Sequence, residues 1–194
     1  MKKGDYKNIT IINDSGREES VNACYLGCGS FTVCYIYNNF VYSFLKESGK
    51  ELDYSKEGIA LWADSDNPHI PNYEYLGDIK DSKLYKSPLY NSLTKNDVQA
   101  WNDYKIISEH AEKNLRYVKK GYSFDINREF IESLKNLVSD KLIDALHSIN
   151  DSLANYGDYY MMEFPKRNLK TDSQENLIFL DVFFNPKSLS SYKS

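Results

Sequence analysis

Three polar residues near the C-terminus have the side-chain types that phosphoryl transfer needs. They are Glu163, the amide residue Asn168, and Asp181, which closes the apolar run 177–180. Phosphoryl transfer uses a carboxylate beside the acceptor hydroxyl, together with oxygen ligands for the metal ions that bridge the nucleotide phosphates. Acids and amides are also common in solvated loops, so a polar surface loop is the alternative interpretation of this set.

A second candidate lies in the sequence Y-L-G-C-G-S-F-T-V at residues 25–33. Its apolar pattern predicts two strands joined by a tight turn containing Gly27 and Gly29. Glycine has no side chain, so the backbone there can approach phosphate oxygens closely. Phe31 and Val33 would then cover the base and sugar of a nucleotide. An ordinary hairpin with a glycine bulge is the alternative structural interpretation.

The next predicted strand, F-V-Y-S-F-L-K, ends at Lys46. Burying an ammonium group is costly unless a phosphate or carboxylate compensates its charge, and such a lysine suits a contact with nucleotide phosphates. A lysine at an exposed strand end is the alternative. Glu57, inside a helical pattern at 52–62, is the candidate partner of Lys46, although Glu47 and Glu51 compete and no spacing rule selects among them.

The elements that must position these groups form a β-rich front and a helical back. From Thr94 the apolar spacing becomes helical, and stripes at 127–138 and 142–153 predict further helices. We therefore expect a domain at 1–90 and a second domain at 91–194. Strands are expected at 9–12, 25–37, 40–46, on both sides of the turn 78–82, at 159–164 and at 177–180.

Length, charge and hydropathy restrict the class of protein. A chain of 194 residues is long enough for one domain or two packed lobes. The net charge of -4, with acids and bases interspersed, argues against direct nucleic-acid binding. No apolar run approaches the roughly 18 residues of a membrane span, and no signal-peptide core follows the polar start. We therefore expect a cytoplasmic protein without a membrane partner.

Cysteine and histidine positions argue against zinc and against histidine-based nucleophilic catalysis. The cysteines are odd in number and have no histidine nearby, which favours reduced packing residues: Cys24, Cys28 and Cys34. His69 lies in a proline-flanked turn, where we do not expect a chemical role. His110 and His147 lie in helical patterns, where packing or solvent exposure is the default.

Taken in order, the motifs resemble the protein-kinase-like fold, and most closely the short serine/threonine kinases encoded by tailed bacteriophages. The matching pieces span residues 25–184 and are L-G-C-G-S-F-T-V-C-Y as the glycine-rich loop, F-L-K, the H-I-P-N turn, E-F-P-K-R-N and L-D-V-F. The resemblance implies an α+β fold with a β-rich N-lobe and a reduced, mainly helical C-lobe. It also implies binding of ATP with Mg²⁺ or Mn²⁺. Lys46 would contact the phosphates, Asn168 and Asp181 would hold the metals, and Glu163 would occupy the position of the catalytic base.

Two functions follow from this resemblance. The first is a minimal serine/threonine protein kinase that phosphorylates host proteins, in the host cytoplasm if the chain is phage-encoded. The second is a catalytically impaired pseudokinase that binds and inhibits a host protein. The second is suggested by Glu163, which stands where the family has aspartate, and by Pro165, which replaces the usual loop lysine. Regulation by an activation loop is not expected, and the short helical half leaves little room for the acceptor pocket of a small-molecule phosphotransferase.

Overall fold

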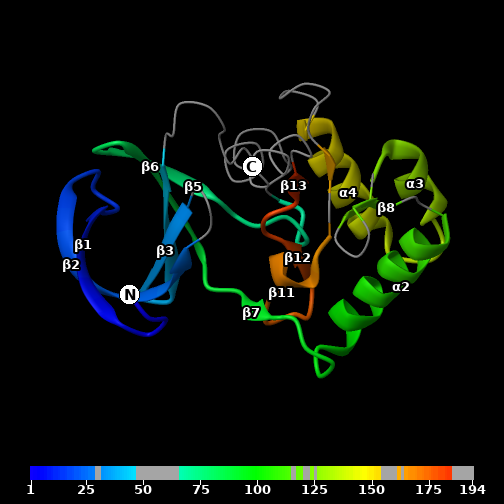
Figure 1. Ribbon diagram of the computed structural model, residues 1–194, viewed down its shortest axis with the longest axis horizontal. Coiled ribbons are helices and arrows are strands. Elements are labelled where there is room, and N and C mark those ends of the chain that lie inside the picture. The colour runs from blue at the N-terminus through cyan, green and yellow to red at the C-terminus, as the bar shows by residue number, and fades with distance from the viewer. Residues whose placement is uncertain are drawn as a thin grey trace. The chain divides into compact units, whose positions relative to one another are not determined.

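The computed structural model describes residues 1–28, 32–46, 66–114, 117–119, 123–124, 126–153, 161–162 and 164–184. These residues form a mixed α+β structure (Figure 1), which is the class expected from the sequence. The chain divides into two compact units. The first unit comprises Met1–Asp53 and Asn72–Leu89, and the second comprises Tyr54–Pro71 and Tyr90–Ser194. A segment of the second unit therefore interrupts the first unit in sequence.

A six-stranded antiparallel sheet forms the first unit. Its strands are β1 (Tyr6–Ile12), β2 (Glu18–Cys28), β3 (Thr32–Tyr37), β4 (Phe40–Lys46), β5 (Glu74–Ile79) and β6 (Ser82–Pro88). They lie in the order β1-β2-β3-β4-β6-β5. Each of these strands was expected and β6 ends at Pro88 as predicted, but β1 and β2 begin earlier than expected, at Tyr6 and Glu18 instead of residues 9 and 25.

The register of the central strands is fixed by a two-residue turn. Asn38 and Asn39 both have positive φ angles, of 49° and 64°. Asparagine tolerates this conformation, and two such residues give the type of turn that matches the twist of a β-hairpin. As a result Val33 pairs with Phe44. The next pair, Cys34 with Ser43, points to the opposite face of the sheet.

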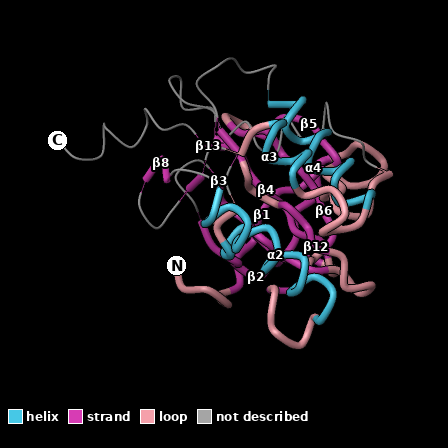
Figure 2. The backbone as a smooth tube through the Cα atoms, turned by 90° about the vertical axis from the view of Figure 1, so that its right-hand side faces the viewer, coloured by secondary structure: helices cyan, strands magenta, loops and turns pink. Residues whose placement is uncertain are grey.

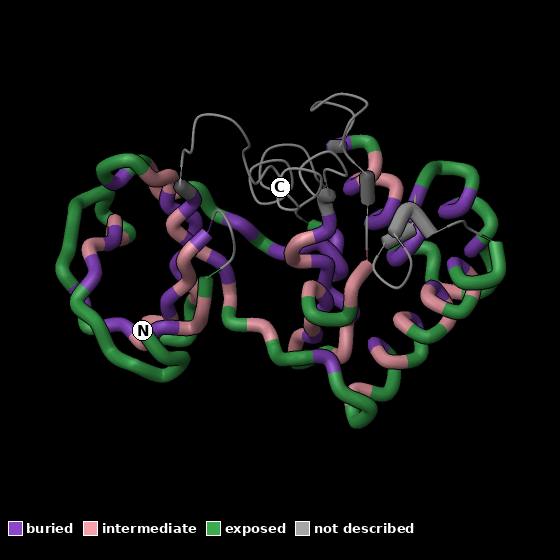
Figure 3. The backbone as a smooth tube through the Cα atoms, in the orientation of Figure 1, coloured by how far each residue is buried: buried purple, intermediate pink, exposed green. Residues whose placement is uncertain are grey.

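The sheet curls around a core made by the inward-facing residues of its strands. In β2, buried residues alternate with more exposed ones from Val21 onward, as expected for a strand with one solvated face, and Figure 3 colours the backbone by burial. Gly77 allows β5 to approach β1, because a Cβ atom at this position would lie 2.8 Å from the Cδ1 atom of Ile12. The core cluster consists of Ile9, Ile11, Val21, Ala23, Tyr25, Tyr35, Tyr42, Ile79 and Leu84.

In its described residues, the second unit combines three α-helices and one 3-10 helix with short strands (Figure 2). The α-helices are α2 (Val98–Asn114), α3 (Arg128–Ser133) and α4 (Asp140–Leu153). The strands are β7 (Asn91–Ser92), β8 (Tyr117–Lys119), β9 (Ser123–Phe124), β10 (Met161–Met162), β11 (Leu169–Thr171), β12 (Leu177–Phe179) and β13 (Phe183–Phe184). They form the small sheets β12-β11-β7, β10-β13 and β8-β9.

The predicted helices exist, but two of them have different bounds. α2 begins at Val98, because its first helical hydrogen bond runs from the backbone nitrogen of Trp101 to the carbonyl of Asp97, at 2.8 Å. Thr94 therefore lies in the turn before the helix. α3 ends at Ser133, well before residue 138, and the chain then passes through turns that include Asn136 at a positive φ of 67°.

Two further expectations are tested by the fold. Cys24, Cys28 and Cys34 are free thiols. Cys24 and Cys34 are half-buried, but Cys28 is exposed, so the expectation of a packing role is wrong for Cys28. Within the part of the chain that the structure describes, no helix is long and apolar enough to cross a membrane.

Candidate functional site

The second unit brings Asn168 and Asp181 together. β11 and β12 form an antiparallel hairpin in which Leu169 pairs with Phe179. Beyond that pair, the backbone nitrogen of Leu180 donates a hydrogen bond of 3.0 Å to the carbonyl of Asn168. The side-chain Nδ2 of Asn168 donates a second hydrogen bond to the backbone carbonyl of Asp181. The hairpin thus places an amide and a carboxylate residue at one end of the small sheet.

Asp172 fixes the turn of this hairpin. Its Oδ1 atom accepts hydrogen bonds of 2.9 Å from the backbone nitrogens of Gln174 and Asn176. Its Oδ2 atom accepts one of 2.9 Å from the side chain of Asn176. Aspartate side chains commonly close turns in this way. The carboxylate of Glu175 then accepts a hydrogen bond of 3.1 Å from the backbone nitrogen of Gln99, which links the turn to the first turn of α2.

His69 supports β12 from the segment that interrupts the first unit. Its Nδ1 atom lies 3.0 Å from the carbonyl of Leu177, and its own carbonyl accepts a hydrogen bond from the backbone nitrogen of Phe179. Because a carbonyl only accepts, we assign the ring proton to Nδ1. Burial lowers the pKa of His69, although the bond to Leu177 and the nearby Asp103 act in the opposite direction. His69 is therefore a neutral structural residue.

Asn67 holds His69 in place. Its Oδ1 atom accepts a hydrogen bond of 3.0 Å from the backbone nitrogen of His69, and its Nδ2 atom donates one of 2.8 Å to the carbonyl of Lys141. Asn67 is buried. The support of β12 thus extends to the first turn of α4. Local sequence patterns did not predict this support of β12, because its contacts join residues far apart in the chain.

α2 contributes two contacts close to this region. Asp103 is only 3% exposed, accepts a hydrogen bond of 3.1 Å from Gln99, and has its pKa raised by burial. The Nζ atom of Lys166 lies 4.5 Å from the ring centroid of Trp101, in a cation–π contact. This contact ties the short 3-10 helix Lys166–Asn168 to α2. Sequence reasoning missed Asp103, because nothing in its local pattern distinguishes it from a surface acid.

The residues predicted to contact a nucleotide belong to the first unit. Gly27 lies inside β2, where it pairs with Cys34, so for Gly27 the prediction of a turn is wrong. It stands instead at a register shift following Tyr25, with a φ of +158° and nothing within 4 Å of an added Cβ atom. Such a bulge matches the alternative interpretation of the glycine pattern. Val33 is partly buried and packs against the core of the sheet.

The other predicted site residues are described in part or not at all. Lys46 is described only as the last residue of β4, where it pairs with Ser82. Gly29, Phe31, Glu57 and Glu163 lie outside the described residues. The partner of Lys46 and the position of the base therefore remain predictions.

Asn168 and Asp181 provide donors that suit a hard cation. Mg²⁺ usually retains waters and uses one or two protein carboxylates together with substrate phosphates, so a small set of protein ligands is sufficient. Among the described residues, no group of three or more His, Cys, Asp or Glu side chains is placed to hold a metal ion. Asn168 and Asp181 have side-chain types that a hard cation accepts, but the structure shows no complete metal site among the described residues.

Comparison with known proteins yields no relative. No family model, no curated protein and no solved structure matches the chain.

Proposed function

We propose that the protein is a minimal ATP-dependent serine/threonine protein kinase of the phage type, which transfers the γ-phosphate of ATP to host proteins. The proposal includes a two-lobed protein-kinase-like fold and binding of Mg²⁺ or Mn²⁺. The observation that carries it is the hydrogen bond from the side chain of Asn168 to the backbone carbonyl of Asp181, at the end of the β11–β12 hairpin. An amide and a carboxylate at one place are the two protein ligand types that kinases use for their metal ions.

The hydrogen bond of Asn168 supports a metal-binding orientation. Its Nδ2 atom is occupied by the carbonyl of Asp181, so the atom left to bind a cation is Oδ1. His69 and Asn67 stabilise the strand that leads to Asp181. A ligand residue at the end of a well-anchored strand is held more precisely than one in a loop.

The remaining roles follow from the sequence motifs. Lys46 would contact the phosphates with Glu57 as its partner, and the backbone at Gly27 and Gly29 would approach them. Phe31 and Val33 would cover the base and sugar. When bound, the metal ion neutralises the charge that develops on the phosphoryl oxygens.

Glu163 would accept the proton of the acceptor hydroxyl. Its side chain is one methylene longer than that of aspartate, and a misplacement of about 1 Å can cost roughly a hundredfold in rate. Phosphoryl transfer through a loose transition state asks little of a base, so a longer carboxylate is tolerable.

The same residue favours a second candidate function. A glutamate in place of the family's aspartate is the change expected of a pseudokinase that binds a host protein without phosphorylating it. Nucleotide binding through Lys46 and Asp181 would then serve to hold the binding conformation.

Binding and transfer should be measured separately on the same variants. Wild type, Asp181→Asn and Glu163→Asp are titrated with Mg-ATP in a thermal-shift assay and incubated with radiolabelled ATP and bacterial lysate. Asp151→Asn, an exposed change on α4, is the matched control. We expect Asp181→Asn to nearly abolish transfer, and Glu163→Asp to preserve or raise it. Ligand binding to the folded state appears as increased stability.

Two outcomes would contradict parts of the proposal. If no variant responds to millimolar ATP with either metal, nucleotide binding is wrong and both candidate functions fail. If ATP binds while wild type and Glu163→Asp transfer no phosphate, the enzyme is excluded. Co-purification of a host protein that survives Asp181→Asn would then support the pseudokinase.

A further inference from the structure

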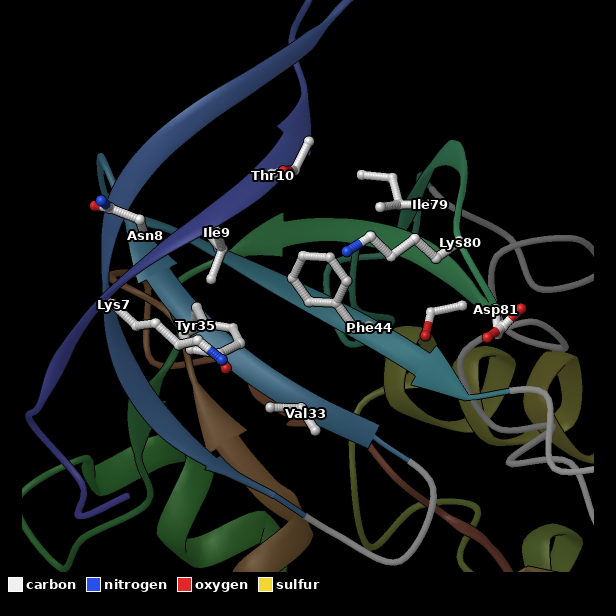
Figure 4. A pocket seen from close by; sticks show the side chains of 11 residues that line it. Lys7, Asn8, Ile9, Thr10, Val33, Tyr35, Phe44, Ile79, Lys80 and Asp81 are labelled. Atoms are coloured by element: carbon white, nitrogen blue, oxygen red, sulfur yellow. The ribbon is translucent and has the colours of Figure 1, made fainter.

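A pocket of about 670 Å³ opens on the inner face of the curled sheet (Figure 4). Its lining comes from β1, β3, β4 and the β5–β6 turn, all of which belong to the first unit. The pocket continues the core of that unit, because Ile9, Tyr35 and Ile79 contribute to both. Its volume lies in the range of about 300 to 1,000 Å³ that is typical of small-molecule sites.

Aromatic side chains form one wall of the pocket. Tyr35 and Phe44 pack edge to face, with ring centroids 5.9 Å apart and an interplanar angle of 86°. Val33 lies beside them on the same face of the sheet. Aromatic surfaces in this arrangement favour a further planar ring, which can stack on one face or present its edge.

Positive charge lines the rim. Lys7 enters from β1 and Lys80 from the β5–β6 turn, and Figure 4 shows the two side chains extending from opposite sides. Both are exposed, and neither forms an ion pair with any residue in the described part of the first unit. Asp81 is the one acid among the described lining residues, so the rim carries a positive excess.

The backbone at Lys80 is unusual. Its φ angle is +54°, a conformation that glycine and asparagine adopt more readily than lysine. Lys80 and Asp81 form the two-residue turn between Ile79 and Ser82, and such hairpin turns require a positive φ at their first residue. The turn geometry therefore accounts for the backbone at Lys80, and the case for its ammonium group rests on its place at the rim of the pocket.

The polar lining is separate from the groups assigned to phosphoryl transfer. Asn168 and Asp181 belong to the second unit, and Gly27 does not line the pocket. Val33 is the one described residue that both lines the pocket and carries a predicted nucleotide contact. Lys7, Lys80 and the hydroxyl residues Thr10 and Ser82 have no part in the nucleotide assignments.

We propose that this pocket is a binding site for a small aromatic anion, a planar ring that carries a carboxylate, sulfonate or phosphate group. The ring would lie against Tyr35 and Phe44, and the anion would lie between Lys7 and Lys80. The hydroxyl groups of Thr10 and Ser82 would donate to it. The proposed ligand differs from ATP, although Val33 lines the pocket and is also a predicted nucleotide contact, and its binding does not depend on kinase activity.

The test uses 8-anilinonaphthalene-1-sulfonate, whose fluorescence reports transfer of the ring system to an apolar site. The full-length wild type is compared with the double variant Lys7→Gln, Lys80→Asn, and with Lys95→Gln as the control for loss of an exposed lysine. Asparagine is chosen at position 80 because it tolerates a positive φ. Unfolding midpoints of all proteins verify that each remains folded, and N-phenyl-1-naphthylamine supplies a similar ring system without charge.

We expect saturable binding of the sulfonate to wild type with one site, and binding about tenfold weaker in the double variant. Lys95→Gln should bind as wild type does, and the uncharged probe should distinguish the variants little. Equal affinity of wild type and double variant for the sulfonate would overturn the assignment. Displacement of the sulfonate by millimolar Mg-ATP would also overturn it, because the pocket would then be the nucleotide site itself.

Discussion

The side-chain amide of Asn168 donates a hydrogen bond to the backbone carbonyl of Asp181, 13 positions further along the chain. The bond closes the open end of the β11–β12 hairpin, whose other end is closed by the turn at Asp172. The separation of the two residues is therefore set at both ends of a short sheet. It does not depend on a long loop, which would allow the pair to drift apart.

Replacing Asn168 by alanine should loosen this end of the hairpin. We expect Asn168→Ala to lower the free energy of unfolding by about 1 kcal/mol, the usual net value of one hydrogen bond. Urea unfolding followed by circular dichroism measures it. Asn102→Ala, at an exposed position of α2, serves as the control and should have little effect. Equal stabilities of wild type and Asn168→Ala would mean that the bond contributes nothing.

Asn67 should matter more for stability, because it is buried and satisfies two backbone groups. Asn67→Ala would leave the nitrogen of His69 unpaired and would remove the side-chain donor to the carbonyl of Lys141 in the first turn of α4. We expect a loss of about 2 to 4 kcal/mol in the free energy of unfolding. Asn67→Asp keeps the acceptor for His69 but turns a carboxylate oxygen toward the carbonyl of Lys141, so it should also lose stability. If both variants were as stable as wild type, the support of β12 by this segment would be incorrect.

Stability should depend on pH through His69. Its folded-state pKa is lowered chiefly by burial, whereas the unfolded chain titrates near the ordinary value of about 6.5. The unfolded state therefore binds more protons over this range, and the free energy of unfolding falls as the pH drops below about 6.5. Above that pH the contribution is fully present.

To test this pH effect, wild type is compared with His69→Asn. This variant can retain a donor for the carbonyl of Leu177 but cannot titrate. Urea unfolding of both proteins at pH 7.5 and pH 5.5 (about one unit either side of the ordinary histidine pKa) should show a smaller loss for the variant. A loss of the same size in both proteins would show that another group causes it.

Gly77 should be the least replaceable of the glycines with positive φ. Alanine at this position would adopt an unfavourable φ of +129° and would also meet Ile12. Gly16→Ala is the matched control, since it has a positive φ of +75° but nothing within 4 Å. We expect Gly16→Ala to cost about 1 kcal/mol or more from backbone strain alone, and Gly77→Ala to cost clearly more. Thermal unfolding compares them, and a reversed order would contradict the close approach of β5 to β1.

The fold was predictable where the signal is local. Alternating residues predicted the strands of the curled sheet, and the apolar stripe of α4 predicted a helix with nearly the observed bounds, because both patterns reflect one buried face of a single element. β11 escaped prediction, since it has only three residues, of which Leu169 is the sole apolar one. Gly27 was misplaced, because a glycine pattern cannot distinguish a turn from a bulge.

The polar residues of the candidate site were predictable from the sequence, whereas the contacts that support β12 were not. Asn168 and Asp181 were selected from residue type and order, and the hairpin brings them together. His69 was assigned no chemical role, which agrees with its burial, but its contact with Leu177 joins positions 108 residues apart. No periodicity within one element reports such a contact.

The interruption of the first unit by Tyr54–Pro71 has a consequence for the order of events during synthesis. Asn67 and His69 leave the ribosome before β5 and β6, yet their partners at Lys141 and Leu177 are made much later. All strands of the first sheet are therefore synthesised before the partners of Asn67 and His69 exist. For the same reason, no single cut separates the two units. A fragment that begins at Tyr90 lacks Asn67 and His69, which support β12. A fragment that ends at Leu89 contains these two residues without their partners.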